Sequence, residues 1–214
     1  MEYLRKPVAG SCSGSDSMPL IHTLPLPGLL YLLFLALAAL TNVGMITALH
    51  ADQNDPQLGV LFSLLQEPAT TESEAAEVTS QIWQKWLESD DEDVDKLMTL
   101  GIHAMNRLAL PEAVIIFSKV IELAPDFAEG WNKRATVYYM MREFQLSTAD
   151  VKNTLKLEPR HFGALSGQGM IYVQTDNNHA AIEFFKRALE VNPSMSALRE
   201  NIEYLEQELK KNVI

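Results

Sequence analysis

The chain has 214 residues, 17 of them basic and 28 acidic, and a formal net charge of −11. Only four charged residues lie in the first fifty, so the later part carries this charge, which argues against a nucleic-acid-binding protein that needs a basic surface. The apolar fraction of 47% is too high for general disorder. The single cysteine, Cys12, excludes a disulfide framework, a cysteine-ligated zinc site and an iron–sulfur cluster.

The N-terminal segment has the composition of a targeting sequence. Residues 28–49 contain no charge, and residues 29–40 are all Leu, Ala, Phe or Tyr. Arg5 and Lys6 precede this stretch and acidic residues come after it, which predicts that the N-terminus stays in the cytoplasm and the rest crosses the membrane. We predict that residues 1–51 are either a cleaved signal peptide or an uncleaved signal anchor, which leaves the remaining chain periplasmic, either exported or anchored to the inner membrane.

Residues 52–93 are predicted to form a degenerate helical hairpin that closes the N-terminal end of the fold. The apolar run from Leu58 to Leu65 begins its first helix, and residues 73–87 form a second helix that carries Trp83 and Trp86. These tryptophans align with apolar positions of the next segment, which begins the repeat described below.

A short sequence motif recurs three times in the next segment. It ends each time in proline, at the equally spaced Pro125, Pro159 and Pro193. Self-similarity at a fixed period, here the interval between successive prolines of this set, predicts a repeat architecture. Because proline cannot continue a helix, each proline is expected to end the second helix of its unit. The three units cover residues 94–127, 128–161 and 162–195.

Each unit carries two stripes of residues at helical spacing, which predicts two helices, A and B. The helix A stripes are Leu97, Leu100, Gly101 and Ala104; Trp131, Arg134, Ala135 and Tyr138; and Leu165, Gln168, Gly169 and Tyr172. The helix B stripes are Ala113, Phe117 and Val120; Ser147, Val151 and Thr154; and Ala181, Phe185 and Ala188. Since one helix pair cannot bury its own apolar face, the pairs are expected to stack, with an amphipathic helix in residues 196–214 as the C-terminal cap.

These residues resemble the tetratricopeptide repeat (TPR), whose pattern has Trp or Leu, then Leu-Gly, then Tyr in helix A, and Ala, Phe, Ala and Pro in helix B. The resemblance covers residues 94–195, and the region from Asp55 onward is also similar to exported bacterial TPR proteins of unassigned role. The turn between the helices lacks its common Gly. The other departures are Arg134, Gln168, Ser147, Val151 and Thr154.

The resemblance implies an all-α fold, a right-handed α–α superhelix, which the apolar segment would precede as an N-terminal helix. In this family the concave side commonly binds an extended peptide or a partner's helix. Helix A residues rotated by about 100° from the stripe are expected to line that side. They are Met98, Ile102, Met105, Asn132, Lys133, Thr136, Tyr139, Ser166, Met170 and Val173.

The family's clamp for the carboxylate tails of chaperones needs Lys, Asn and Arg side chains on the A helices. Met98, Ile102, Lys133, Gly163 and Gly167 occupy those positions here, so this class of ligand is not expected.

No residue pattern predicts catalysis or a metal site. His103, His161 and His179 lack the spacing of paired metal ligands, and we interpret them as ordinary surface or half-buried histidines. Residues 90–93 lack the alternating ligands and central Gly of a calcium loop and are interpreted as a solvated acidic start of a helix.

The glycines at positions 163, 167 and 169 follow no predicted strand, so they are interpreted as points of close helix packing or as an open groove floor rather than as a phosphate loop. The chain is therefore predicted to have no cofactor and no enzymatic activity.

The function expected from the sequence is a non-catalytic interaction or scaffold module of a Gram-negative-type bacterium, which binds a protein or peptide partner on the exported side of the membrane. An alternative of another class is a structural or envelope-assembly protein that self-associates through the helix at Leu58 to Leu65.

Overall fold

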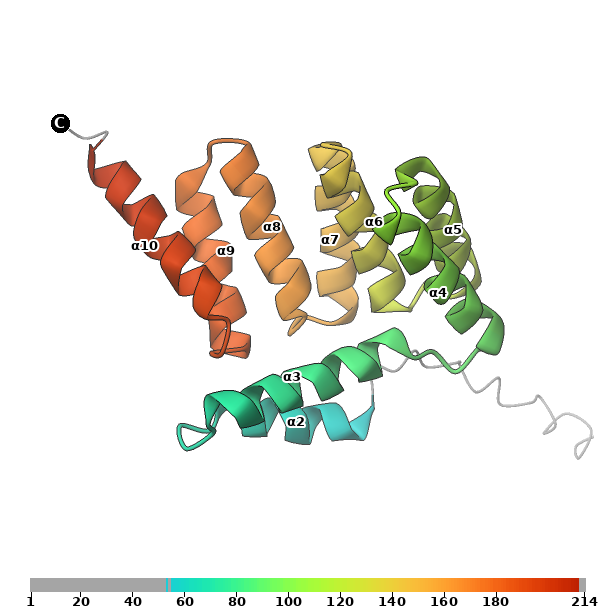
Figure 1. Ribbon diagram of the computed structural model, residues 1–214, viewed down its shortest axis with the longest axis horizontal. Helices are drawn as coiled ribbons and strands as arrows, with labels where there is room; N and C mark the ends of the chain where they lie inside the picture. Colours follow the sequence, from blue (N-terminus) through green and yellow to red (C-terminus); the bar gives the residue numbers. More distant parts are fainter. Residues whose placement is uncertain (1–52, 54, 212–214) are drawn as a thin grey trace, which may run out of the picture. The chain divides into compact units, whose positions relative to one another are not determined.

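The computed structural model describes residue 53 and residues 55–211, and these form regular structure of one kind, α-helix (Figure 1). The helices are α2 (Pro56–Gln66), α3 (Glu72–Leu87), α4 (Glu92–Asn106), α5 (Leu110–Leu123), α6 (Ala128–Met140), α7 (Phe144–Leu157), α8 (Phe162–Gln174), α9 (Asn178–Val191) and α10 (Ser196–Lys211). The all-α prediction is confirmed for this part of the chain. The predicted targeting segment 1–51 lies outside the described residues, and none of the described helices has the length and apolar character that a bilayer span requires.

Helices α4–α5, α6–α7 and α8–α9 form three antiparallel hairpins that stack side by side, and α10 packs on α9 (Figure 1). Helices α5 to α9 lie within the predicted repeat units, whereas α4 begins at Glu92, before the predicted start of the first unit at residue 94. Asp91 starts the stack, because its side chain accepts hydrogen bonds from the backbone N–H groups of Asp93 and Val94 and so caps α4. This gives the acidic run at residues 90–93 a role at the beginning of a helix.

Within a hairpin, a small residue of helix A faces a larger one of helix B. A Cβ atom on Gly101 would lie 2.5 Å from Cε1 of Phe117, so only glycine fits there. The middle hairpin has Ala135 and Val151 at the same two positions, and both are buried in one apolar cluster. Val151 is smaller than the phenylalanine at this position, and Ala135 opposite it is larger than glycine. The two changes compensate in part, but the smaller Val151 side chain leaves space nearby.

The turns between helices A and B share one backbone conformation. Leu108, Arg142 and Asp176 occupy equivalent positions in the three units and have φ angles of 62°, 62° and 56°. This left-handed region favours glycine, which the sequence lacks at all three turns. The backbone N–H of the residue after each of them donates to a carbonyl near the end of helix A, as from Ala109 to Ala104 over 2.9 Å.

Leu100 and Trp131, both predicted in the helix A stripes, are less buried than expected. Leu100 is 57% exposed, because no earlier hairpin lies against it. Arg134, its counterpart one repeat later, contacts the preceding hairpin by donating to Ser118 Oγ over 3.0 Å and pairs with Asp150 over 2.7 Å. Trp131 is only half-buried, and its indole N–H donates to the carbonyl of Pro125 over 2.9 Å.

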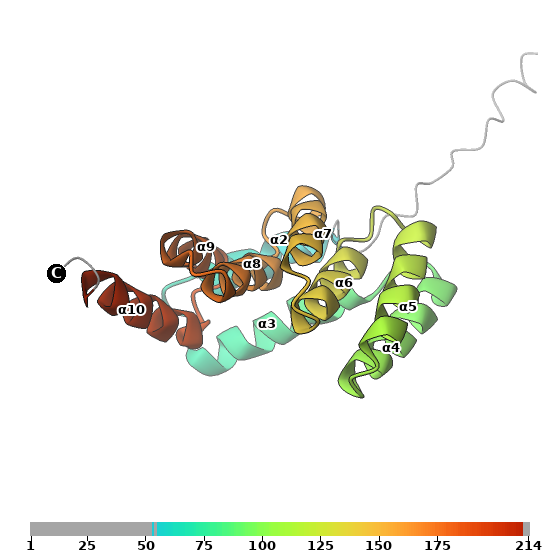
Figure 2. The same cartoon turned by 90° about the horizontal axis from the view of Figure 1, so that it is seen from above.

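The α2–α3 pair, which we call the N-terminal hairpin, does not occupy the expected place. It runs across the lower ends of the stacked helices instead of stacking as a further repeat (Figure 1), and the view from above places it beneath them (Figure 2). Asn192 Nδ2 donates to Thr79 Oγ1 over 3.1 Å, and Gln66 Nε2 donates to the carbonyl of Glu190 over 3.2 Å. The expectation that this pair closes the N-terminal end of the stack was wrong, since Trp86 packs on His161 and Phe162, where the second repeat unit meets the third.

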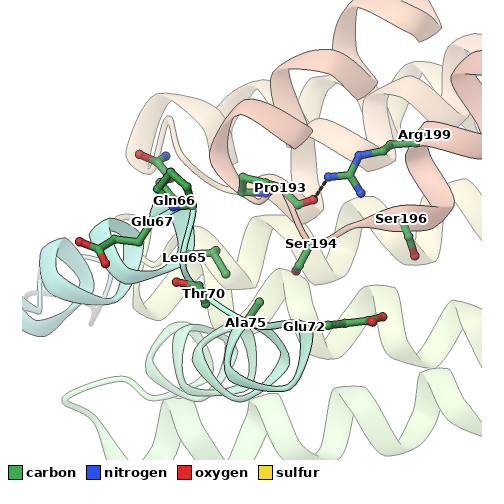
Figure 3. Close-up of a pocket in the computed structure, with 11 residues that line it drawn as sticks. Leu65, Gln66, Glu67, Thr70, Glu72, Ala75, Pro193, Ser194, Ser196 and Arg199 are labelled. Atoms are coloured by element: carbon green, nitrogen blue, oxygen red, sulfur yellow. Dashed lines mark hydrogen bonds between the residues drawn. The ribbon is translucent and has the colours of Figure 1, made fainter.

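The turn of the N-terminal hairpin also faces the connection between α9 and α10 across a cavity of about 440 Å³ (Figure 3). Leu65 and Ala75 line it from the hairpin, and Ser194 and Arg199 line it from the other side. The guanidinium of Arg199 donates to the carbonyl of Pro193, which ties the first turn of α10 to the loop before it.

Candidate interaction groove

A pocket of about 110 Å³ opens between α6 and α8, with α7 behind it. It is lined by Asn132, Ala135, Thr136, Tyr139, Ser147, Val151, Gly163, Gly167 and Met170. Four of the ten residues predicted to line the groove therefore come together here: Asn132, Thr136, Tyr139 and Met170. We call this hollow the side-chain pocket, because small-molecule sites usually measure about 300–1,000 Å³ and this space is smaller.

The pocket exists because two small residues leave room. A Cβ atom on Gly167 would meet no heavy atom within 4 Å, so this glycine forms an open floor. Val151 stands where the first and third repeats have Phe117 and Phe185, whose rings lie against the glycines of their own hairpins. Both sequence interpretations of the glycine cluster thus apply, since Gly167 leaves open space and Gly169 packs closely on Phe185.

The other predicted groove residues have different surroundings. Met98 is 2% exposed and belongs to the α4–α5 core, so its side chain is not available on the groove surface. Asn132, its counterpart one repeat later, is also mostly buried, at 6% exposed, but it lines the side-chain pocket. Ser166 donates its hydroxyl proton to the carbonyl of Gly163. Ile102 and Met105 pack, partly buried, on the first core, and Val173 does so on the α8–α10 core.

The N-terminal hairpin closes one end of the groove. A Cβ atom on Gly163, at the start of α8, would lie 2.5 Å from Cη2 of Trp83. The Nζ atom of Lys133 lies 5.3 Å from the centre of the same indole ring, in cation–π contact. Trp83 therefore covers the groove where α6 and α8 begin, and the side-chain pocket lies beyond it. The repeat register puts Trp83 at an apolar position, but no sequence pattern indicates this contact.

A buried polar network fixes this covered end. His161 and Glu129 are both fully buried, and the ring Nε2 lies 2.9 Å from the Oε2 atom of Glu129. The ring Nδ1 accepts a hydrogen bond of 3.0 Å from the backbone N–H of Ala164, so the proton belongs on Nε2, which donates to the carboxylate. His161 thereby caps α8 with one nitrogen and holds α6 with the other.

Lys133 and Asn132 also contact the carboxylate of Glu129. Lys133 Nζ lies 2.8 Å from Oε1, and Asn132 Nδ2 donates to Oε2 over 2.9 Å. Burial would raise the pKa of the Glu129 carboxyl, but the charge of Lys133 and the hydrogen bond from His161 outweigh it, so the pKa lies below its ordinary value. Glu129 is therefore a buried carboxylate that stays charged because Lys133 and His161 lie beside it.

The indole of Trp86 is stacked on the imidazole of His161, with ring centres 4.0 Å apart and planes 10° apart. Trp86 also contacts Phe162, the first residue of α8, at 4.9 Å between ring centres. His161 thus belongs to both the repeat stack and the contact with the N-terminal hairpin. Its predicted role as an ordinary histidine understates this position, which no spacing in the sequence indicates.

The repeat geometry agrees with comparisons to known proteins. A sequence model of the tetratricopeptide repeat matches residues 163–195. A TPR repeat-containing protein of Rhizobium etli is 31% identical over 180 residues, which cover 84% of this chain and 87% of that protein. The chain belongs to the tetratricopeptide repeat family. The stacked hairpins are accordingly TPR units, whose third member matches the family pattern.

Solved structures have the same fold over about half of this chain. The first TPR domain of Spaghetti (RPAP3), bound to the HSP90 peptide SRMEEVD, is 19% identical with a TM-score of 0.54, over 56% of this chain and 96% of that one. The TPR2B domain of yeast Sti1, in complex with pHsp70, is 20% identical with a TM-score of 0.52, over 55% of this chain and 99% of that one. At these identities the likeness establishes the TPR fold.

The titratable groups of the described residues do not assemble into a reaction centre. Among them, no three His, Cys, Asp or Glu side chains are grouped so as to hold a metal ion. Glu129 and His161 bond to each other inside the protein, and neither lines the side-chain pocket. Nothing in this arrangement points to an enzyme.

Proposed function

We propose that this TPR protein is a non-catalytic interaction module that binds a peptide or helix of a partner protein between α6 and α8. The side-chain pocket carries this proposal, because it is an apolar-floored hollow of about 110 Å³ with room for one aliphatic side chain of the partner. Thr136 and Tyr139 line it and provide hydroxyl groups for the partner's backbone. The Thr136 hydroxyl already donates to the carbonyl of Asn132, so it is left to accept a hydrogen bond.

The comparisons support a peptide as the ligand class. Two proteins with the same fold hold an HSP90 peptide or pHsp70 in their solved complexes. Recognition through a carboxylate clamp is not part of the proposal, because Lys133 is engaged by the buried Glu129 and the glycines at 163 and 167 have no side chain. An apolar anchor residue suits the pocket better than an acidic tail.

The cellular setting of the proposal rests on the N-terminal sequence. Residues 28–49 are long and uncharged, and the basic and acidic flanks favour export of the rest of the chain. We place the TPR domain outside the cytoplasm, as an exported protein or one tethered to the inner membrane. There it would hold its partner close to the membrane surface.

The alternative of self-association through α2 has less support. Leu58, Leu61, Phe62 and Leu65 are buried in a cluster with residues of α3 and the start of α8. Exchange of α2 between two chains would require this cluster to open first. The apolar face that suggested pairing is therefore already used within one chain.

The substitution Gly167→Leu tests the proposed groove. The new side chain enters open space and replaces glycine inside a helix, so we expect α8 to keep its structure and gain helix propensity. Peptides that bind the purified full-length protein are selected from a random phage-displayed library, and their affinities are measured by fluorescence anisotropy. We expect Gly167→Leu to weaken their binding at least tenfold because it fills the pocket.

Gly59→Leu is the matched control, since Gly59 on α2 also faces open space and lies away from the pocket. Its affinity for the same peptides should stay within twofold of the unmodified protein. Equal binding by the unmodified protein and Gly167→Leu would contradict the assignment of the groove.

A further inference from the structure

The N-terminal hairpin carries a second groove, on a surface that the stacked repeats do not use. Its cavity of about 420 Å³ lies between α2 and α3. It is lined by Leu64, Glu67, Ala69, Thr70, Glu74, Glu77, Val78 and Gln81. We call it the hairpin groove. Apolar and acidic residues line the hairpin groove, whereas no acidic residue lines the side-chain pocket between α6 and α8.

Apolar side chains are exposed along α2 next to the hairpin groove. Leu64 is 44% exposed and Val60, one helical turn earlier, is 62% exposed. The other apolar residues of α2 point inward and are buried, so these two form an outward stripe at i, i+4 spacing. A helix in the partner that presents apolar residues at the same spacing would cover both.

The charge of the hairpin is almost entirely of one sign. Residues 55–89 contain six acidic side chains and one basic side chain, Lys85, whose ammonium lies 2.9 Å from Asp55. Glu74 and Glu77 are one turn apart on α3 and both line the hairpin groove. Hydrogen bonds from the hydroxyl and backbone N–H of Thr71 hold the pKa of Glu74 below its ordinary value, which keeps this carboxylate charged.

We propose that the hairpin groove binds a basic amphipathic helix of a partner protein. Its apolar residues would contact Leu64 and Val60, and Lys or Arg one turn apart would face Glu74 and Glu77. Charge decides between the possible occupants: a second copy would bring an equally acidic hairpin, and an anionic membrane or nucleic acid would be repelled. This proposal does not depend on the proposed function, because the hairpin groove and the α6–α8 groove are separate surfaces.

A designed peptide tests the proposal on the full-length protein. The probe is a fluorescent, amidated 18-residue peptide of Lys and Leu, with Leu at helical spacing on one face, and its binding is measured by anisotropy. We expect Glu74→Gln with Glu77→Gln, and separately Leu64→Ser, to weaken binding at least tenfold. Gln at position 74 keeps the capping interaction with Thr71, so the double variant is expected to retain α3.

Controls separate this groove from general attraction to an acidic protein. Glu183→Gln with Glu203→Gln removes the same charge from exposed positions on α9 and α10, and should change affinity less than twofold. A peptide of the same composition without the apolar stripe should bind at least tenfold more weakly than the probe. Equal losses in the groove and control variants, or no binding of the probe, would overturn the proposal.

Two further outcomes distinguish the occupants and the two grooves. Concentration-dependent dimerisation in light scattering that Leu64→Ser abolishes would assign the hairpin groove to a second copy, and so would overturn the proposal. Gly167→Leu should leave affinity for the probe unchanged, so a failure of the α6–α8 groove is separable from a failure of the hairpin groove.

Discussion

Gly169 in α8 lies so close to Phe185 in α9 that a Cβ atom at this position would stand 2.5 Å from Cδ1 of the ring. Two residues earlier on the same helix, Gly167 faces open space. The same substitution at these two positions should therefore have opposite effects.

Gly167→Ala should raise the free energy of unfolding by about 0.5–1 kcal/mol, because alanine is the better helix former. Gly169→Ala should lower it by about 1–3 kcal/mol, because the methyl group forces the phenyl ring of Phe185 from its place. Urea unfolding followed by circular dichroism measures both. A stabilised Gly169→Ala variant would contradict the close packing.

The left-handed turn residue Leu108 gives a second prediction. Its φ of 62° costs a side chain about 1–2 kcal/mol, and the side chain is largely exposed. Leu108→Gly should therefore raise the free energy of unfolding by about 0.5–1 kcal/mol in spite of the added freedom of the unfolded chain. Met141→Gly is the comparison, because Met141 has φ −79° and glycine brings no relief there. Its unfolding midpoint should fall.

Removing the imidazole of His161 should loosen the N-terminal hairpin. His161→Ala leaves the carboxylate of Glu129 short of a donor and takes away the ring on which Trp86 stacks. We expect a loss of about 2–4 kcal/mol, since an unsatisfied buried group and a cavity both result. Hydrogen exchange should quicken in α2 and α3 more than in α4 and α5.

The exposed His103 provides the control for that experiment, and His103→Ala should change the free energy of unfolding by less than about 0.5 kcal/mol. Uniform acceleration of exchange in all helices of the His161→Ala variant would argue against a specific loss of hairpin contact.

Glu129 predicts a dependence on pH. Its pKa is lowered in the folded state, so it contributes stability that is complete above the ordinary glutamate pKa of about 4.3 and is lost as the pH falls through the folded value. Glu129→Gln removes this titration. Between pH 5 and pH 3, the stability of the variant should therefore decline less steeply than that of the unmodified protein, as measured by urea unfolding. Parallel curves would show that Glu129 does not have a lowered pKa.

The stacked repeats were predictable from the sequence because their contacts are local and recur. Gly101 and Phe117 meet within one unit, and the same pair returns in the third unit as Gly169 and Phe185. Rotation around helix A also predicts that Thr136 faces the side on which the side-chain pocket lies, and Thr136 lines that pocket. It failed for Met98, because the rule considers only angle and ignores the preference of a long apolar side chain for the interior.

The position of the N-terminal hairpin was not predictable by the same means. Trp86 and His161 are distant in the sequence and meet once, so no period marks their contact. The alignment of Trp83 with Phe117 even suggested a further stacked repeat. Buried polar partners add to the difficulty, since Glu129, between Ala128 and Gly130, has the sequence context of an exposed helix residue.

Because α3 is joined to α4 by a short connection and also docks on residues that start α8, the described chain closes on itself. Linear repeat arrays unzip from either end, one unit after another. Here the third repeat unit cannot separate while Trp86 packs on Phe162. The N-terminal hairpin likewise cannot leave without exposing the start of the third unit to solvent. The array is therefore expected to melt as one cooperative block, and a pull on the start of α2 would reach the second and third repeats before the first.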